Sequence, residues 1–452
     1  MCTVRMLLFV VCLAVAGAVL LTFTLTSAYE RRLYTDRLQA QQAIIEELSG
    51  EEYSAGRNLQ LLDEVVRYYS YYAGSMDAQA MLEAAFKAYV AASGDPYAQY
   101  YTLEEYRAIA AENSGDYCGI GVTVVNHILQ TESGDYLTFW VQEVYGSSSA
   151  MEAGLQVGDH IYAVEQPDGA ILTLNETGYD QALAAVRGEE GTTVRLWVLR
   201  PLEGGGYEQK TFEVTRRPYE SVSVRAKLLE KDATVGIVSI SGFDLTTPHQ
   251  FREAVDGLLS QGVQHFVFDV RNNPGGDLQS IKAVLSYFLQ EGDLVLSAID
   301  RNGNVAASYL VEETQLTGDY AGCSVSREQI GMYADLDMVV LCNGNTASAA
   351  EVFTATLRDY GLARIVGTTT YGKGIMQTTR PIRFEGELAG YIKLTTYAYV
   401  TQCGQSYHDV GIVPDTEVEL SEEAQQIPLL MLPQDQDGQL QTAAALLLNG
   451  GQ

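Results

Sequence analysis

The chain has 452 residues, with 58 acidic residues against 28 basic ones, and its net charge of −30 gives an isoelectric point near 4.4. A nucleic-acid-binding protein needs a clustered basic surface, so this balance excludes nucleic acid as a partner. With 47% hydrophobic residues, 42 glycines and only 10 prolines, the sequence is neither disordered nor collagen-like, and its length indicates about three domains.

The first predicted element is a membrane segment. Residues 6–28 carry no charge, and they are long enough to cross the roughly 30 Å hydrocarbon core of a bilayer as a helix. Basic residues flank both ends, so the charges give no clear orientation. We expect residues 1–29 to be a retained anchor with the body outside the cytoplasm. Thr26-Ser27-Ala28 also suits signal-peptide cleavage, in which case the protein would be secreted.

Residues 30–112 are predicted to be helical. Apolar side chains recur there at three- and four-residue spacing, as on one face of an amphipathic helix, and they include Leu61, Leu62, Val65, Val66 and Tyr69. A second helix is predicted over residues 76–92, and Gly94-Asp95-Pro96 ends it because glycine and proline interrupt helices.

Residues 113–217 change to short apolar runs separated by Gly, Asn and Asp, which is typical of a small β-rich domain. The predicted strands cover residues 119–125, 136–144, 161–164, 193–199 and 211–214. Glu203-Gly204-Gly205-Gly206 lies between the last two runs, as a hairpin turn would.

Strands alternate with helices in residues 218–420. The predicted strands cover 234–240, 265–270, 338–342 and 364–367, and the predicted helices cover 247–261, 277–290 and 348–360. Such alternation predicts right-handed βαβ units and a largely parallel sheet. Residues 421–452 form a C-terminal segment. The expected fold is an α/β core with an inserted β-rich domain, flanking helices and an N-terminal transmembrane helix.

Three polar loops follow the predicted parallel strands, at residues 271–276, 343–351 and 368–374. Sites in open α/β sheets form beyond the carboxyl ends of the strands, so chemistry is expected in these loops. The glycines of the first loop permit an unusual backbone path with free N–H groups, although a plain turn explains them equally well.

Ser348 and Lys373 are the candidate reactive residues of the other two loops. Ser348 is predicted to begin a helix, where the dipole and unpaired N–H groups can stabilise an oxyanion. One βαβ unit would place both loops at the same sheet edge, and a desolvated lysine can activate a serine hydroxyl. From the spacing alone, a capping serine and a solvated lysine remain the commoner interpretation.

Four ordered motifs resemble those of the carboxyl-terminal processing peptidases. They are DVRNNPGG at 269–276, NTASAAE at 345–351, YGKG at 371–374 with Gln377, and GIVPD at 411–415. The resemblance covers about residues 95–415 and implies a serine endopeptidase, membrane-anchored or exported, with a Ser/Lys dyad. Thr346 and Ala350 stand where serines are frequent in the family, whereas the nucleophile position keeps its serine.

The β-rich domain resembles the PDZ module that the family inserts ahead of its catalytic core. Its carboxylate-binding loop would be Gly119-Ile120-Gly121-Val122, and residues 153–159 are similar to the later turn of such a module. Consecutive N–H groups in this loop can hold a terminal carboxylate while the adjacent strand edge pairs with the peptide. Arg187, at the end of the predicted helix of this module, is a candidate ligand sensor or an ordinary helix-end cation.

The resemblance also implies a role for each site residue. Ser348 is the expected nucleophile, Lys373 the general base, and Gln377 the residue that positions the lysine. The expected oxyanion hole consists of backbone amides, those of Ala349 and of Gly275 or Gly276. No cofactor or metal is implied, and the sequence has no HExxH or CxxC spacing for zinc.

The expected substrate is a protein whose free, apolar C-terminus docks in the PDZ groove and which is cleaved through an acyl-enzyme. The helical segments outside the core are candidates for homodimerisation, as in some members of the family. Two alternatives remain, a catalytically silent PDZ scaffold and another Ser/Lys enzyme such as an amidase. The presence of all three catalytic residues disfavours the scaffold, and a domain that binds C-termini disfavours the amidase.

Overall fold

The computed structural model describes Arg32 and residues 55–114, 116–131, 134–165, 169–202, 204–384 and 387–449. The chain divides into two compact units, residues 1–82 and residues 83–452. The predicted membrane segment, residues 1–29, lies outside the described residues. Within the described part of the chain, no helix combines the length and the apolar character that crossing a bilayer requires.

The first unit is helical where it is described. It contains α2 (Ala55–Tyr69), a 3-10 turn η1 (Ala73–Ser75) and the start of α3 (Ala78–Ala91). Asp77 precedes α3, and its Oδ1 accepts hydrogen bonds from the N–H groups of Gln79 and Ala80 at 2.9 and 3.1 Å. This is the usual way in which an aspartate satisfies the free N–H groups of a first helical turn. The helix predicted over residues 76–92 is confirmed.

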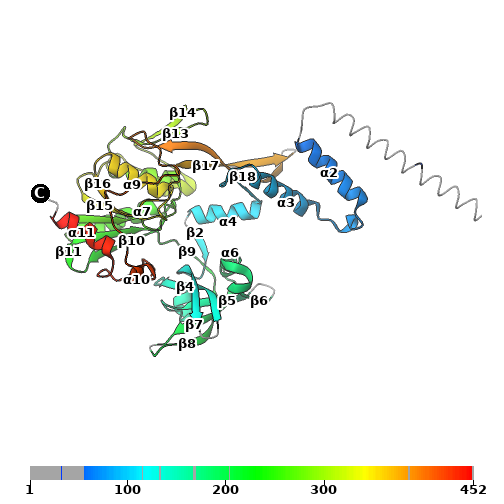
Figure 1. The fold of residues 1–452 in the computed structure, drawn as a ribbon, viewed down its shortest axis with the longest axis horizontal. Coiled ribbons are helices and arrows are strands. Elements are labelled where there is room, and N and C mark those ends of the chain that lie inside the picture. The colour runs from blue at the N-terminus through cyan, green and yellow to red at the C-terminus, as the bar shows by residue number, and fades with distance from the viewer. Residues whose placement is uncertain are drawn as a thin grey trace, which may run out of the picture. The chain divides into compact units, whose positions relative to one another are not determined.

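The second unit contains a six-stranded sheet in the order β10-β11-β12-β15-β16-β19, of which Figure 1 labels β10, β11, β15 and β16. Its strands are β10 (Val224–Leu229), β11 (Asp232–Ile240), β12 (His265–Asp269), β15 (Asp337–Cys342), β16 (Ala363–Gly367) and β19 (Thr416–Glu417). The strands from β11 to β19 are parallel, and β10 is antiparallel to β11. The parallel arrangement predicted from the strand–helix alternation is confirmed.

Different helices cover the two faces of this sheet. Successive side chains of a strand point to opposite faces. Phe268 and Val340 therefore pack with α7 (Thr247–Ser260), α8 (Leu278–Ser286) and α9 (Ala349–Asp359). Val267 and Val339 pack on the other face, against α11 (Gly438–Asn449) of the C-terminal segment. Because both faces are buried, these strands are apolar almost throughout.

A second sheet, which is antiparallel, was not predicted from the sequence. It has the order β1 (Gln99–Tyr101), β18 (Glu387–Val400), β13 (Leu294–Ile299) and β14 (Val305–Leu310), and β17 (Ile375–Phe384) also pairs with β18. The segment expected to be helical, residues 30–112, is helical in α3 and α4 (Leu103–Ser114) but forms β1 between them. The strand forms there because Tyr100 and its neighbours extend β18, with Tyr100 opposite Ile392.

The inserted β-rich region is an antiparallel sheet with two helices. Its strands are β3 (Val122–Thr131), β4 (Gly134–Val144), β5 (His160–Glu165), β7 (Thr193–Pro201) and β8 (Tyr207–Thr215), and β6 (Ile171–Thr173) pairs with β5. Helices α5 (Ser149–Ala153) and α6 (Leu174–Val186) share its apolar core. β2 (Asp116–Gly119) and β9 (Arg217–Glu220) pair where the chain enters and leaves the region. The five predicted strands are all present.

Candidate active site

Ser348 lies between β15 and α9, at a helix start as expected from the sequence. Its backbone has φ 56° and ψ −120°, a conformation that residues other than glycine rarely adopt and that concentrates at functional sites. A comparable strained turn from strand to helix exposes the nucleophile of α/β-hydrolases. The side chain of Ser348 is half-buried, so the local backbone suits a serine that must meet a substrate.

The glycine loop after β12 contacts the nucleophile directly. Gly275 has φ 104°, and a Cβ at this position would lie 2.8 Å from both the Ala349 nitrogen and the Ser348 Cβ. Only glycine therefore permits this approach. The Gly275 N–H donates to Asn273 Oδ1 at 2.8 Å. Among the described residues, the N–H groups of Ala349 and Gly276 have no hydrogen-bond acceptor, so these two of the predicted oxyanion donors remain available.

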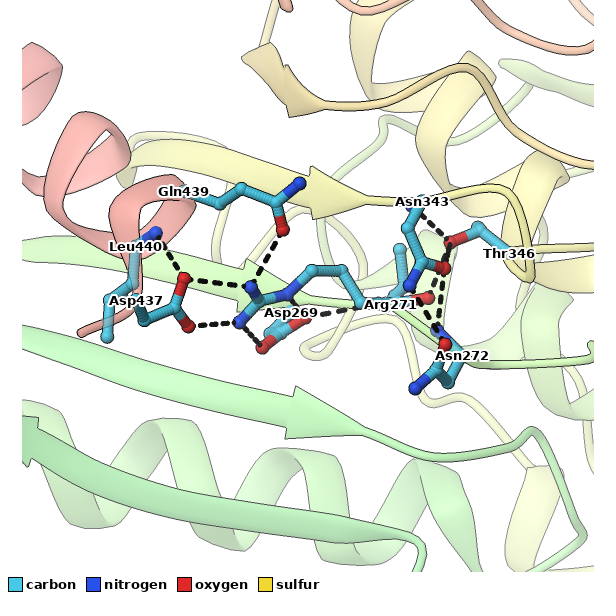
Figure 2. Close-up of polar contacts among 9 residues, drawn as sticks. Asp269, Arg271, Asn272, Asn343, Thr346, Asp437, Gln439 and Leu440 are labelled. Atoms are coloured by element: carbon cyan, nitrogen blue, oxygen red, sulfur yellow. Dashed lines mark hydrogen bonds and ion pairs between the residues drawn. The ribbon is translucent and has the colours of Figure 1, made fainter. Parts of the chain in front are cut away.

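Side chains lock the loop after β12 to the loop after β15 (Figure 2). Asn343 Oδ1 accepts from the Asn272 N–H at 2.9 Å, and Asn343 Nδ2 donates to Asn272 Oδ1 at 2.8 Å. Thr346 Oγ1 donates to the Val270 carbonyl oxygen at 2.8 Å. The two loops meet because β12 and β15 are parallel neighbours whose carboxyl ends lie at the same edge.

Glu351 connects the nucleophile loop to the lysine loop. Its side chain is fully buried in the first turn of α9. One carboxylate oxygen accepts hydrogen bonds from the N–H groups of Ser348 and Lys373 at 3.0 and 2.8 Å. The other accepts from Thr370 Oγ1 and the Gly372 N–H at 2.6 and 2.7 Å. Glu351 was not among the residues predicted from the sequence to form the site, although a glutamate three residues after a helix-start serine has the spacing of a capping box.

The Lys373 ammonium lies over the face of Tyr97, 4.8 Å from the ring centroid. Burial lowers the pKa of Lys373, the positive charge of Lys393 lowers it further, and the Glu351 carboxylate opposes the shift. A lowered pKa enlarges the neutral fraction of the amine, which is the form that accepts a proton. The electrostatic surroundings of Lys373 therefore suit a general base.

The side chains of Ser348 and Lys373 are not hydrogen-bonded to each other in the described part of the chain. Burial raises the pKa of the Tyr399 phenol, and the neighbouring hydroxyl groups of Tyr407 and Ser348 oppose that rise. The same phenol donates to the Lys373 carbonyl oxygen at 2.6 Å. Glu351 and Tyr399 thus hold the backbones of the two predicted residues, while the Lys373 ammonium contacts the Tyr97 ring and the Ser348 hydroxyl lies near Tyr399. Tyr399 lies in the antiparallel sheet that the sequence did not reveal.

Gln377 lies in β17 and contacts Thr395 of β18, its Nε2 donating to Thr395 Oγ1 at 3.3 Å. The Asp95 carboxylate accepts from the Thr395 N–H and Oγ1 at 2.7 and 3.0 Å. Although burial opposes ionisation, these hydrogen bonds hold the pKa of Asp95 below its usual value. Gln377 is therefore linked to the turn that carries Tyr97, and its hydrogen bonds do not include one to Lys373.

The predicted carboxylate-binding loop lies between β2 and β3. Gly121 has φ 77°, and a Cβ there would collide with the side chain of Ser148, so glycine is required. The Gly121 carbonyl accepts from the Tyr145 N–H at 3.0 Å, and the Ile120 carbonyl accepts from the Ala150 N–H at 3.0 Å. These bonds fix the carbonyl groups of the loop to the start of α5.

A cavity of about 890 Å³ connects this loop to the parallel sheet. Apolar side chains of β4 and α6 line it near the loop, together with Gly119, Ile120, Val122 and Arg187. On the side of the core, the cavity reaches Arg225 of β10 and the interlocked Asn272 and Asn343. The C-terminal segment contributes residues 427–430 to a further wall. Neither Gly121 nor Ser348 is among the lining residues.

The model of a family described as Peptidase family S41 matches residues 234–418, which include Ser348, Lys373 and Gln377. A CtpA-like serine protease of Staphylococcus epidermidis is 30% identical over 324 residues, 72% of this chain and 58% of the relative. One of Staphylococcus aureus is 28% identical over 377 residues, 83% of this chain and 68% of the relative.

The chain thus spans 58% and 68% of the lengths of these two curated relatives. The crystal structure of a protein from Bacteroides fragilis, described as an S41 protease, has a TM-score of 0.54 at 19% identity. The similarity covers 89% of this chain and 99% of that one, and it bears on the fold alone. Taken together, the matches confirm the family resemblance that the four motifs indicate.

Proposed function

Because residues 234–418 belong to the S41 family of serine peptidases, we propose that this chain is an endopeptidase that uses Ser348 as nucleophile and Lys373 as general base. Its substrates would be proteins with a free, apolar C-terminus. The observation that carries the proposal is the buried Glu351 carboxylate, which binds the backbone N–H groups of both residues. Glu351 also caps α9, and its bond to the Lys373 N–H extends this cap to the loop of the proposed base.

In the proposed reaction, neutral Lys373 takes the proton of Ser348 as the hydroxyl oxygen attacks the carbonyl carbon of a peptide bond. The free N–H groups of Ala349 and Gly276 are the candidate donors to the oxyanion. The leaving amine receives the proton from Lys373, and water then hydrolyses the acyl-enzyme. In the reactive arrangement the Lys373 amine leaves the Tyr97 ring and meets the Ser348 hydroxyl, while Glu351 holds the backbones of both residues.

The β-rich region is proposed to act as a PDZ domain. β3 is an edge strand, so its outer N–H and C=O groups can pair with an extended peptide. The cavity beside it is apolar where Phe139, Leu183 and Val186 line it, which favours an apolar terminal side chain. The cavity continues toward the loops that follow β12 and β15, so a bound C-terminus would direct the rest of the substrate toward the core.

Two further proposals rest on the sequence. The uncharged residues 6–28 would anchor the chain in a membrane, with the catalytic region outside the cytoplasm. The helices ahead of the core would support homodimerisation, since α2 exposes apolar side chains such as Leu62. Fractionation of cells and measurement of the molecular mass in detergent would check these two points.

The catalytic proposal is tested by mass spectrometry of a protein substrate incubated with the purified chain and with Ser348→Ala. One substrate ends in apolar residues, and a matched substrate carries an added C-terminal aspartate. We expect the wild-type chain to cleave the first substrate at least 10 times faster than the second, because the added charge opposes docking in an apolar groove. Ser348→Ala should lose at least 1,000-fold in rate, as removal of a nucleophile does.

Cleavage by both proteins at similar rates would exclude Ser348 as the nucleophile. Cleavage by neither, with the apolar C-terminus still bound, would favour a binding scaffold. Equal cleavage of the two substrates by the wild type would remove the PDZ part of the proposal while leaving the serine peptidase intact.

A further inference from the structure

A buried arginine lies at the base of the glycine loop. Arg271 lies two residues after the end of β12, and only 7% of it is exposed to solvent. Its guanidinium donates two hydrogen bonds to Asp269, from Nε to Oδ1 at 2.9 Å and from Nη2 to Oδ2 at 2.7 Å. Burial opposes the charge of the guanidinium, but the neighbouring carboxylates outweigh this effect and raise the pKa of Arg271. Asp269 binds Nε and one of the two terminal nitrogens, so the remaining N–H groups of the guanidinium are left to other partners.

The outer donors are taken by the C-terminal segment (Figure 2). Asp437 accepts hydrogen bonds from both terminal nitrogens of Arg271, from Nη1 to Oδ1 at 3.0 Å and from Nη2 to Oδ2 at 2.7 Å. Gln439 Oε1 accepts a further hydrogen bond from Nη1 at 2.9 Å. Asp437 is 4% exposed and Gln439 2%. A bidentate pair of this kind fixes the orientation of the guanidinium as well as its position.

Asp437 is itself fixed by the helix that it precedes. Its Oδ1 accepts from the Leu440 N–H at 3.0 Å in the first turn of α11, and Leu440 is buried against the parallel sheet. Gln439 is fixed as well, since its Nε2 donates to the Val418 carbonyl at 2.7 Å. The ion pair of Asp437 and Arg271 therefore couples the position of α11 on the sheet to the position of the backbone at the end of β12.

The residues after Arg271 lead directly to the nucleophile. Asn272, with φ 58°, is bound by Asn343 from the neighbouring loop. Asn273 is fully buried, and its Nδ2 donates to the Ile240 carbonyl at 2.9 Å. Gly275 then passes Ser348 so closely that no Cβ fits between them. A displacement of Arg271 would thus move the backbone that lies against the serine.

We propose that Asp437 is a positioning residue for the peptidase reaction, which acts by holding Arg271 and thereby the 272–276 loop against Ser348. This inference rests on the proposed function. The position of the 272–276 loop then depends on Asp437, which lies outside the range 234–418 that the family model matches. Asp437 touches no reacting atom. It lines the 890 Å³ cavity on the side of the core with Asp269 and Arg271, whereas Phe139, Leu183 and Val186 of the β-rich region line the part proposed to hold the substrate C-terminus, so its main effect is expected on turnover.

The experiment compares Asp437→Asn, Asp437→Ala and the control Asp435→Ala in the full chain. Asp435 is exposed and lies only two residues away. kcat and KM for the apolar-tailed substrate are measured beside the thermal midpoint and the affinity for a peptide with the same C-terminus. Displacing catalytic groups by about 1 Å costs on the order of 100-fold in rate. We expect kcat to fall about 100-fold in Asp437→Ala and about 10-fold in Asp437→Asn.

KM and peptide affinity should stay within threefold of wild type in both variants, and Asp435→Ala should match wild type. Asp437→Asn keeps the oxygen that binds the Leu440 N–H, so it decides the matter if Asp437→Ala does not fold. A folded Asp437→Asn variant whose kcat lies within twofold of wild type would overturn the proposal. So would a loss of kcat that merely follows the fraction of unfolded protein.

Hydrogen–deuterium exchange gives a result that does not depend on cleavage. We expect faster exchange in residues 272–276 of Asp437→Asn and unchanged exchange in α7, which packs on the opposite face of the parallel sheet from α11. Unchanged exchange in residues 272–276 would overturn the positioning role even if the wild-type chain proved to be a scaffold. Failure of the peptidase function itself would appear separately, in the wild type and in Ser348→Ala.

Discussion

The nucleophile side and the base side of the candidate site are built in different ways. The nucleophile side consists of two loops at one edge of the parallel sheet, joined by Asn272, Asn343 and the close approach of Gly275 to Ser348. The base side places Lys373 against Tyr97 and near Lys393 of the antiparallel sheet. The buried carboxylate of Glu351 binds the backbone N–H groups of Ser348 and Lys373, and the Tyr371 N–H donates to the Thr346 carbonyl oxygen between the same two loops at 3.0 Å.

The nucleophile side therefore determines the position of Ser348, and the base side determines the protonation of Lys373. Short backbone approaches and buried hydrogen bonds determine where Ser348 lies, so errors there should reduce turnover at every pH. A ring face and a partly exposed cation influence the charge of Lys373, so changes there should move the pH dependence of the reaction. A change at Glu351, which connects the two sides, should have the largest effect on the reaction, a change at Tyr97 a smaller effect, and a change at Lys393 the smallest.

Glu351→Gln should break the connection between the two sides. An amide of the same size offers one acceptor oxygen, and its NH2 group would face two of the four donors that now bind the carboxylate. Each buried donor left without a partner costs about 1–3 kcal/mol. We therefore expect kcat/KM to fall at least 100-fold, with a lower thermal midpoint. Steady-state cleavage assays and thermal unfolding check both effects.

Glu328→Gln is the matched control for this change, because Glu328 is exposed and lies in the same unit. It should leave the rate and the midpoint unchanged. A Glu351→Gln variant that retains wild-type activity would mean that the four hydrogen bonds are dispensable for aligning the two loops.

Tyr97→Leu should disturb the base side alone. The ring face stabilises the ammonium form of Lys373, and such contacts are worth about 0.5–2 kcal/mol. Loss of the ring should therefore lower the pKa of Lys373. The acid limb of kcat/KM should thus move to lower pH. The plateau rate should fall by about a factor of five to ten, because the amine loses a contact that orients it.

Tyr97→Phe keeps the ring and removes only the hydroxyl, which is a hydrogen-bond partner of Tyr371. Its pH profile should coincide with that of the wild type. A shift of the Tyr97→Leu profile to higher pH would show that the ring acts chiefly by excluding water from the amine.

The two sides also differ in how far the sequence predicted them. The parallel strands have continuous apolar runs because both of their faces are buried, so the loops with Ser348 and Lys373 could be located from periodicity and motifs. The partners of Lys373 could not, because β1 and β18 lie almost 300 residues apart in the sequence and pair through backbone groups. Asp437 was equally hidden, since an isolated aspartate before a helix indicates only a cap.

Lys393→Met should produce the smallest change and the opposite shift from Tyr97→Leu. The positive charge of Lys393 lowers the pKa of Lys373, so its removal should raise that pKa and move the acid limb of kcat/KM to higher pH. Lys393 is only half-buried, and water and salt weaken such an interaction. We expect a shift of a few tenths of a pH unit, an unchanged plateau, and a smaller difference from wild type in 0.5 M salt than in 0.05 M salt. The salt dependence should follow from a Debye length of roughly 4 Å in the first solution and about 14 Å in the second. Lys393→Arg keeps the charge and should match the wild type, whereas equal shifts in both variants would trace the effect to the packing of β18 on Tyr101 and not to charge.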